Sequence, residues 1–147
     1  MNPAGIYIHI PFCRSHCSYC DFATGMYTAA LAQHYVPHLA KEIKSFGTVE
    51  KPSTVDTIFF GGGTPSLLTS AQLETILNAV LERFAVSSGA EVTMEMNPGT
   101  VAPETLSAYR NLGVNRASFG AQTFDDNELA RLGRSHTADD RSEEHTS

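Results

Sequence analysis

The sequence predicts an α/β fold built on a parallel β-sheet. Four short apolar runs are typical of strands, and they comprise residues 5–10, 55–60, 91–96 and 116–120. Apolar residues at helical spacing occupy the connections between these runs, and the connections are too long for β-hairpins. Strands that alternate with helices form right-handed β-α-β units, so we expect the strands to be parallel. An open doubly wound sheet and a barrel both satisfy this pattern.

The second connection carries the strongest helix signal. Its apolar residues lie on one face of a helix, and they are Leu73, Ile76, Leu77, Val80, Leu81 and Phe84. Thr69, followed three residues later by Gln72, matches a capping box, in which each side chain accepts a hydrogen bond from the other residue's backbone N–H. We therefore expect this helix to begin near Ser70.

The first and third connections predict two further helices. Residues 33–46 carry apolar side chains at helical spacing, namely Val36, Leu39, Ile43 and Phe46. Pro37 lacks an N–H and suits a first turn, so the regular helix is expected to begin near it. In the third connection Pro103 suits the first helical position and Gly113 the end. A fourth helix is expected to start near residues 129–132.

Composition narrows the class of protein. The chain has 147 residues, of which 41% are hydrophobic and 18% charged, as in an ordinary globular domain. Ten Lys and Arg against 16 Asp and Glu give a net charge of −6, which argues against nucleic-acid binding. Glycines and a proline interrupt the longest uncharged stretch, residues 57–73, so no transmembrane segment is expected. Residues 1–10 match neither a secretory signal nor a transit peptide, which favours a cytoplasmic location.

The C-terminal segment differs from the rest. From residue 135 onward the only apolar residue is Ala138. The last seven residues, RSEEHTS, are what the start of a common short-read sequencing adapter encodes in one frame. Our hypothesis is that residues 141–147 are adapter-derived and that residues 1–140 are the N-terminal part of a longer domain. The alternative is a short disordered tail.

Three cysteines within eight residues indicate metal or redox chemistry. Cys13, Cys17 and Cys20 have the spacing C-x3-C-x2-C, and an odd count without a secretory signal argues against a disulfide framework. A four-iron cluster held by three thiolates leaves one iron open to a small molecule. Two alternatives remain, which are a zinc site completed by His16 or His9 and a thiol redox pair of the last two cysteines.

The unusual residues all follow predicted strands. The cysteine segment follows the first strand, the run Gly-Gly-Gly-Thr-Pro of residues 61–65 follows the second, residues 95–98 end the third and residues 120–122 end the fourth. Because the carboxyl ends of parallel strands share one edge, we expect these segments to meet there, where α/β folds place their active sites.

Together these segments resemble the radical SAM superfamily, whose members use S-adenosylmethionine. The resemblance rests on Tyr-Ile-His-Ile-Pro-Phe at residues 7–12 before C-x3-C-x-Y-C, on residues 61–65 and 95–98, and on residues 115–122. Within the superfamily it points to the branch of oxygen-independent coproporphyrinogen oxidases and HemW-type haem chaperones. The fold it implies is a partial (β/α) barrel, of which this chain holds the first four strands with their helices.

The resemblance also implies roles for particular residues. Cys13, Cys17 and Cys20 would hold a four-iron, four-sulfur (4Fe-4S) cluster whose open iron chelates S-adenosylmethionine, and reduction of the cluster would cleave the sulfonium. The residues expected around S-adenosylmethionine are Tyr7, Tyr19, Gly62, Gly63, Thr64, Glu95, Gln122 and Arg134. Taken singly, several have simpler interpretations: Glu95 as a solvated strand end, Arg134 as a surface charge, Tyr7 as a core residue and His9 as a packed histidine.

Position 22 separates the two members of the branch. The oxidases have a fourth cysteine there, whereas here Cys20 is followed by Asp21 and Phe22, as in the HemW-type chaperones. The resemblance thus favours a chaperone that binds haem, with an oxidase of coproporphyrinogen as the alternative and a zinc module as a third. The partners it implies are haem or a porphyrin, a haem-acceptor protein, and a reductant such as flavodoxin or ferredoxin. Since four strands cannot close a barrel, we expect the chain alone to be insoluble or molten.

Overall fold

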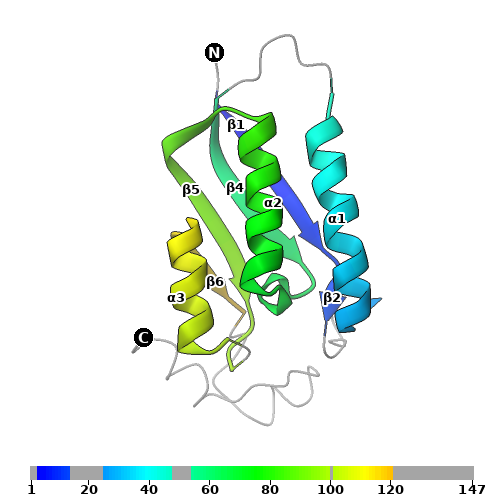
Figure 1. Cartoon of the computed structure of the whole chain (residues 1–147). Helices are drawn as coiled ribbons and strands as arrows, with labels where there is room; N and C mark the ends of the chain where they lie inside the picture. The colour runs from blue at the N-terminus through cyan, green and yellow to red at the C-terminus, as the bar shows by residue number, and fades with distance from the viewer. Residues whose placement is uncertain (1–2, 14–24, 48–53, 100, 121–147) are drawn as a thin grey trace.

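The computed structural model describes residues 3–13, 25–47, 54–99 and 101–120, which form a four-stranded sheet covered by helices. The sheet has the order β1-β4-β5-β6, with all neighbours parallel. Its strands are β1 (Ala4–Ile10), β4 (Val55–Gly62), β5 (Val86–Met96) and β6 (Arg116–Phe119). The helices α1 (Ala29–Ser45), α2 (Ser70–Arg83) and α3 (Pro103–Leu112) lie on one face of the sheet (Figure 1). The prediction of a parallel α/β fold is confirmed.

The first helix begins eight residues earlier than Pro37, so the prediction that this proline marks the first turn is wrong. Thr28 caps α1, because its hydroxyl accepts a 3.1 Å hydrogen bond from the Leu31 N–H. Four residues of α1 are buried at helical spacing, namely Ala32, Val36, Ala40 and Ile43. Pro37 lies on the exposed side of the same helix, where burial of the opposite face outweighs the lost backbone hydrogen bond.

The other two helices follow their predictions. Thr69 and Gln72 form the capping box at the start of α2, with bonds of 2.9 and 3.1 Å. Helix α3 begins with Pro103 at its first turn and ends at Gly113, which has φ of +120°. The predicted fourth helix lies outside the described residues.

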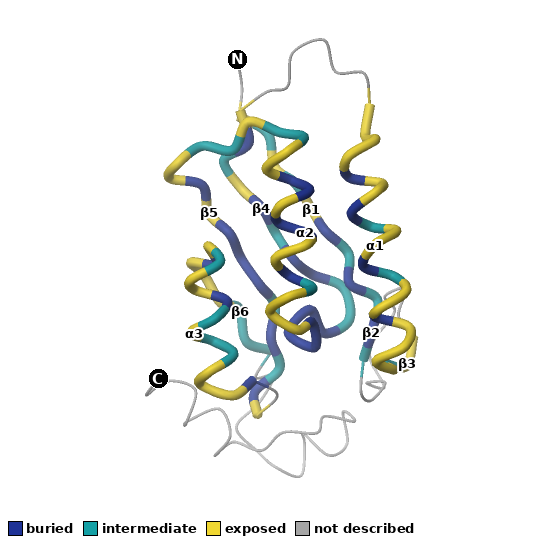
Figure 2. The backbone as a smooth tube through the Cα atoms, in the orientation of Figure 1, coloured by how far each residue is buried: buried dark blue, intermediate teal, exposed yellow. Residues whose placement is uncertain are grey.

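Alternation along the strands separates a helix-covered face from an open one. Ile8 and Ile10 of β1 are buried, as are Phe60 of β4 and Met94 of β5, and Figure 2 shows the burial concentrated under the helices. Tyr7, by contrast, is 57% exposed, so its simpler interpretation as a core residue is wrong. Register pairs Tyr7 with Phe59, and Phe59 with Thr93, so these three side chains lie on the face opposite the helices, where Thr93 is nevertheless buried.

Strands β4 and β5 extend well beyond their predicted limits, and β1 begins one residue early, at Ala4. Strand β4 continues to Gly62, and β5 begins at Val86 instead of residue 91. The sheet register shifts between Val55 and Thr57, so the first part of β5 pairs irregularly with β4. Such an irregularity breaks the simple alternation on which strand prediction depends.

Three short elements were not predicted. Strands β2 (Phe12–Cys13) and β3 (Gly25–Met26) form a two-stranded parallel sheet, and the 3-10 turn η1 (Pro65–Leu67) follows β4.

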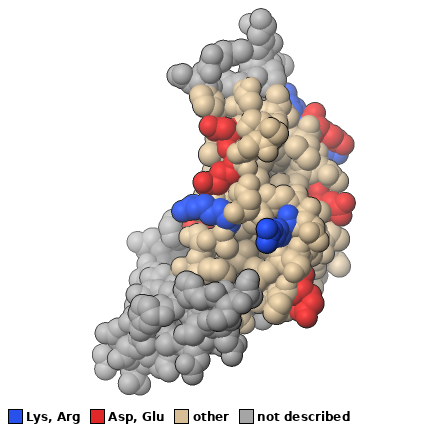
Figure 3. Space-filling model, turned by 90° about the vertical axis from the view of Figure 1, so that its left-hand side faces the viewer, with Lys and Arg blue, Asp and Glu red and all other residues tan. Residues whose placement is uncertain are grey.

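None of the described helices has the length and apolar character needed to cross a membrane. On the face drawn in Figure 3, basic and acidic side chains are interspersed.

Candidate functional site

The carboxyl ends of β1, β4 and β5 meet at one edge of the sheet, as predicted. Strand β1 leads directly into Phe12 and Cys13, and its last residues pair with the end of β4 through His9 with Gly61 and Ile10 with Gly62. Glu95 lies on β5 one residue beyond Met94, which pairs with Phe60. Three of the predicted segments therefore come together.

Backbone hydrogen bonds fix Cys13 at this edge. The N–H of Gly25 donates to the Pro11 carbonyl at 2.6 Å, and the N–H of Tyr27 donates to the Cys13 carbonyl at 2.8 Å. Cys13 is half-buried, and the chain enters and leaves the cysteine segment at adjacent positions. The other predicted ligands, Cys17 and Cys20, lie outside the described residues, as do Tyr19, Gln122 and Arg134.

The glycine-rich segment is bound to the strand that carries Cys13. The Gly63 N–H donates to the Ile10 carbonyl at 2.8 Å, and the Thr64 N–H donates to the Phe12 carbonyl at 2.7 Å. Thr64 is buried, and its hydroxyl accepts a 3.0 Å hydrogen bond from the Asn97 amide. The backbone after β4 thus holds the residues that directly precede Cys13.

Gly62 has a conformation and a position that only glycine accommodates. Its φ is +114°, and a Cβ there would lie 2.7 Å from the His9 ring and 2.9 Å from the Ile10 carbonyl oxygen. Gly62 and Gly63 remain half-exposed, so a ligand at this edge can reach their backbone.

A polar cluster surrounds Glu95. The Gly62 N–H donates a hydrogen bond to the Glu95 carboxylate. Burial raises the pKa of Glu95 above its ordinary value, and this effect outweighs the hydrogen bond from Gly62 and the nearby His9, which lower it. A half-buried carboxylate at a strand end suits a cationic amine or sulfonium as ligand.

Tyr7 and His9 complete this cluster on the open side. The Tyr7 hydroxyl lies 3.1 Å from His9 Nδ1, and the Tyr7 ring stacks on Phe59 with centroids 6.0 Å apart. Partial burial, and then the charge of Glu95, raise the pKa of the Tyr7 phenol. Tyr35 of α1 donates a 2.6 Å hydrogen bond to the His9 carbonyl, which ties the helix to this strand.

Sequence reasoning missed three residues that organise the site. The Asn97 amide donates a hydrogen bond to the Thr64 hydroxyl, and the Tyr35 hydroxyl donates one to the His9 carbonyl. The Tyr109 hydroxyl of α3 donates to the backbone that follows Thr64. Asn97 lies within a segment already singled out by its position after a strand. The two tyrosines act across 26 and 43 residues of sequence, and no local pattern indicates such contacts.

The described residues fit the cofactors that the resemblance implies. Cys13, the exposed backbone of Gly62 and Gly63, and the Glu95 carboxylate all lie at the same edge. The combination of a thiolate donor, reachable backbone and a carboxylate matches a cluster beside a zwitterionic, cationic ligand.

Comparison with known proteins agrees with the resemblance to the radical SAM superfamily. A profile of the radical SAM superfamily matches residues 7–143. The heme chaperone HemW of Escherichia coli (strain K12) is 42% identical over 137 residues, which are 92% of this chain and 36% of that protein. HemW of Synechocystis sp. is 44% identical over 142 residues, 92% of this chain and 34% of that protein. This chain therefore spans about a third of the length of these relatives.

The solved structure of coproporphyrinogen III oxidase (HemN) from Escherichia coli, a radical SAM enzyme, superposes with a TM-score of 0.86 at 28% identity. The match covers 95% of this chain and 32% of that one. The four parallel strands are thus part of a radical SAM barrel, and the chain belongs to the radical SAM superfamily, in the branch that holds HemW and the oxygen-independent coproporphyrinogen oxidases.

Proposed function

We propose that this chain is the N-terminal part of a HemW-type haem chaperone, which binds haem and transfers it to an acceptor protein. The observation that carries the proposal is the similarity to proteins named heme chaperone HemW, which are 34% to 44% identical over at least 92% of this chain. Phe22 supports the same assignment, because the resemblance places a fourth cysteine there in the oxidases.

The proposed cofactors are a 4Fe-4S cluster and S-adenosylmethionine. Cys13, Cys17 and Cys20 would hold the cluster, and a reduced cluster of this kind supplies an electron to the bound sulfonium. The residues proposed to surround S-adenosylmethionine are Tyr7, Tyr19, Gly62, Gly63, Thr64, Glu95, Gln122 and Arg134. Support comes from the shared edge on which Cys13, Gly62 and Glu95 lie.

In this assignment Glu95 binds the cationic side of S-adenosylmethionine. Its carboxylate is held by the Gly62 N–H, and its half-buried position strengthens the attraction to a positive group. The Tyr7 hydroxyl, bonded to His9, borders the same space. The backbone groups of Gly62 and Gly63 are reachable because neither residue has a side chain.

The second candidate is an oxygen-independent coproporphyrinogen III oxidase, which removes two propionate carboxyl groups in porphyrin biosynthesis. The structural similarity to HemN favours it. Both candidates require a porphyrin partner and an electron donor, for which flavodoxin or ferredoxin is proposed. The proposed location is the cytoplasm, where thiolate ligands stay reduced.

One experiment separates the candidates. The full-length protein, reconstituted anaerobically with iron and sulfide, is incubated with S-adenosylmethionine, a reductant and either coproporphyrinogen III or haem. A chaperone shifts the haem absorption spectrum stoichiometrically and forms no protoporphyrinogen. HemN serves as the positive control for turnover, and Cys13→Ser as the cluster-deficient control. Stoichiometric conversion of coproporphyrinogen would refute the chaperone assignment.

A further inference from the structure

Tyr109 is buried beneath the backbone that follows the glycine-rich segment. It belongs to α3, is 1% exposed, and lies 43 residues beyond Ser66 in the sequence. Its hydroxyl donates to the carbonyl of Ser66 at 3.1 Å and also to the carbonyl of Leu68. Since a phenol has one proton, the two carbonyls share it. Burial raises the pKa of this phenol to about 12, so the donor stays protonated at neutral pH.

The Ser66 carbonyl lies within η1, and the Leu68 carbonyl directly follows it. Within this turn the Leu67 N–H donates to the Thr64 carbonyl at 3.0 Å, and the Leu68 N–H donates to the Pro65 carbonyl at 3.1 Å. These two backbone hydrogen bonds therefore stabilise the turn, which starts at Thr64. The Tyr109 side chain, from a separate helix, donates to two carbonyls of this segment.

The same turn is continuous with the backbone that bonds the residues directly before Cys13. Thr64 donates its N–H to the Phe12 carbonyl at 2.7 Å, and Gly63 donates to the Ile10 carbonyl at 2.8 Å. Cys13 is the next residue after Phe12. Hydrogen bonds and short stretches of backbone thus form a continuous path from the Tyr109 hydroxyl to Cys13.

We propose that Tyr109 is a positioning residue, which sets the geometry of Gly63, Thr64 and, through Phe12, the first cysteine. The link to cofactor binding rests on the proposed function above. Burial of Pro65, Leu67 and Leu68 also holds the turn against the core. Apolar burial is non-directional, however, whereas hydrogen bonds to carbonyl oxygens define an orientation.

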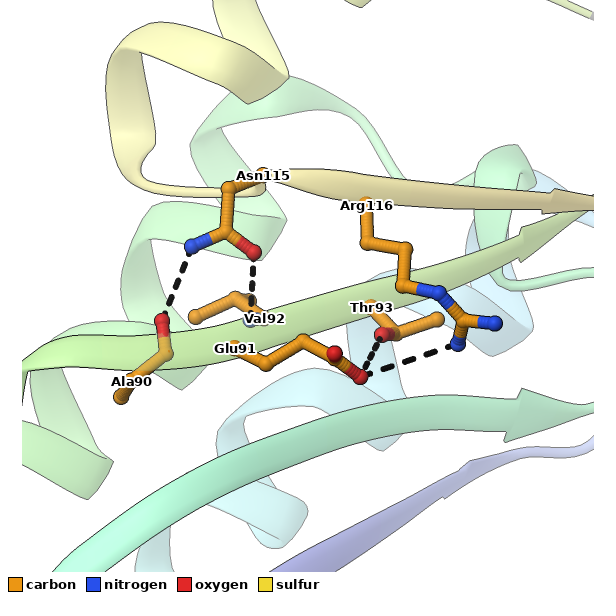
Figure 4. Close-up of polar contacts among 6 residues, drawn as sticks. All are labelled: Ala90, Glu91, Val92, Thr93, Asn115 and Arg116. Carbon is orange, nitrogen blue, oxygen red and sulfur yellow. Dashed lines mark hydrogen bonds and ion pairs between the residues drawn. The ribbon is translucent and has the colours of Figure 1, made fainter.

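Tyr109→Phe tests this role, because it removes the donor and keeps the ring. The matched control is Asn115→Ala. Asn115 also ties two backbone groups, since its amide donates to the Ala90 carbonyl at 2.8 Å and accepts from the Val92 N–H at 2.8 Å (Figure 4). These bonds lie where β6 begins, away from the carboxyl end of β5. Each variant thus loses two hydrogen bonds between a side chain and the backbone, but only Tyr109→Phe loses them beside the site.

The first measurement is amide hydrogen exchange of the full-length protein without cofactors, followed on peptides that contain Gly63 and Thr64. We expect exchange of these amides to be about tenfold faster in Tyr109→Phe than in Asn115→Ala. The second is the affinity of the reconstituted protein for S-adenosylmethionine, expected to weaken about tenfold in Tyr109→Phe alone.

The outcomes separate the two proposals. Equal exchange in both variants overturns the positioning role, and so does faster exchange with unchanged S-adenosylmethionine affinity. If the unmodified protein binds no S-adenosylmethionine, the proposed function fails, while the exchange measurement still decides whether Tyr109 orders the segment.

Discussion

Gly63 and Phe12 approach so closely that a Cβ on Gly63 would lie 2.4 Å from the Phe12 carbonyl oxygen and 2.8 Å from its carbonyl carbon. Phe12 would be met through its backbone atoms, so it cannot make room without a shift of the main chain. The Thr64 N–H bond to the same carbonyl fixes this contact. Glycine is therefore needed at position 63 for the close packing against the strand that bears Cys13, whether or not a ligand also binds there.

Replacing this glycine should destabilise the protein. We expect Gly63→Ala to lower the free energy of unfolding by about 2 kcal/mol, as for other overpacked sites. Gly89→Ala is the control, because a Cβ there has no neighbour within 4 Å. It should raise stability by about 0.5 kcal/mol. Chemical denaturation measures both, and equal effects would contradict the close-contact explanation.

The raised pKa of Glu95 predicts a pH-dependent difference between the wild type and Glu95→Gln. Because the folded protein binds this proton more tightly than the unfolded chain, the stabilisation is complete at acid pH and is lost as pH rises through the folded pKa. Glu95→Gln should therefore gain stability relative to wild type as pH rises above 4.5, the ordinary pKa of a glutamate carboxyl. Glu74→Gln, at an exposed carboxyl of α2, controls for the lost charge. A constant difference across this range would count against the raised pKa.

The raised pKa of Tyr109 predicts that the free energy of unfolding also depends on pH in the alkaline range. Its pKa rises from 10.0 to about 12 on folding, so its stabilisation is present below pH 10 and is lost as pH rises toward 12. The wild type should lose on the order of 2 kcal/mol relative to Tyr109→Phe over this interval. Denaturation at several alkaline pH values, with phenolate absorbance, measures it. Parallel stability curves for the two proteins would contradict the burial of the phenol.

The capping box of α2 gives a simpler test. Thr69→Ala removes the hydroxyl that accepts from the Gln72 N–H, and we expect a loss of about 1 kcal/mol in unfolding free energy. Thr75→Ala is the control, because its exposed hydroxyl donates to the Ala71 carbonyl inside the helix and does not cap the helix end. If both substitutions lower the unfolding free energy by the same amount, Thr69 is not acting as a cap.

The helices and strands could be predicted because their signals are local. The capping residues of α2 and the proline and glycine at the ends of α3 lie within a few positions of the structure they determine. Pro37 misled the prediction because its effect depends on which face of α1 is buried, and that face is set by packing on the sheet. The extra residues of β5 were missed because an irregular register breaks the alternation.

The candidate site was predictable only in part, for the same reason. The parallel direction of the strands places Cys13, Gly62 and Glu95 at one edge, and the alternation of strands and helices in the sequence predicts that direction. The requirement for Gly63 depends on the Phe12 backbone, and the role of Tyr109 depends on a turn 43 residues earlier. Such contacts exist only once the chain has folded, so no spacing within the sequence predicts them.

In the proposed function, Cys13, Cys17 and Cys20 hold a cluster with one iron open to S-adenosylmethionine. The most direct test is iron and sulfide content of the anaerobically reconstituted full-length protein, with electron paramagnetic resonance of its reduced form before and after S-adenosylmethionine is added. We expect about four irons per chain, a signal that changes on addition, and loss of both in Cys13→Ser. A colourless protein that binds zinc and no iron would contradict the account.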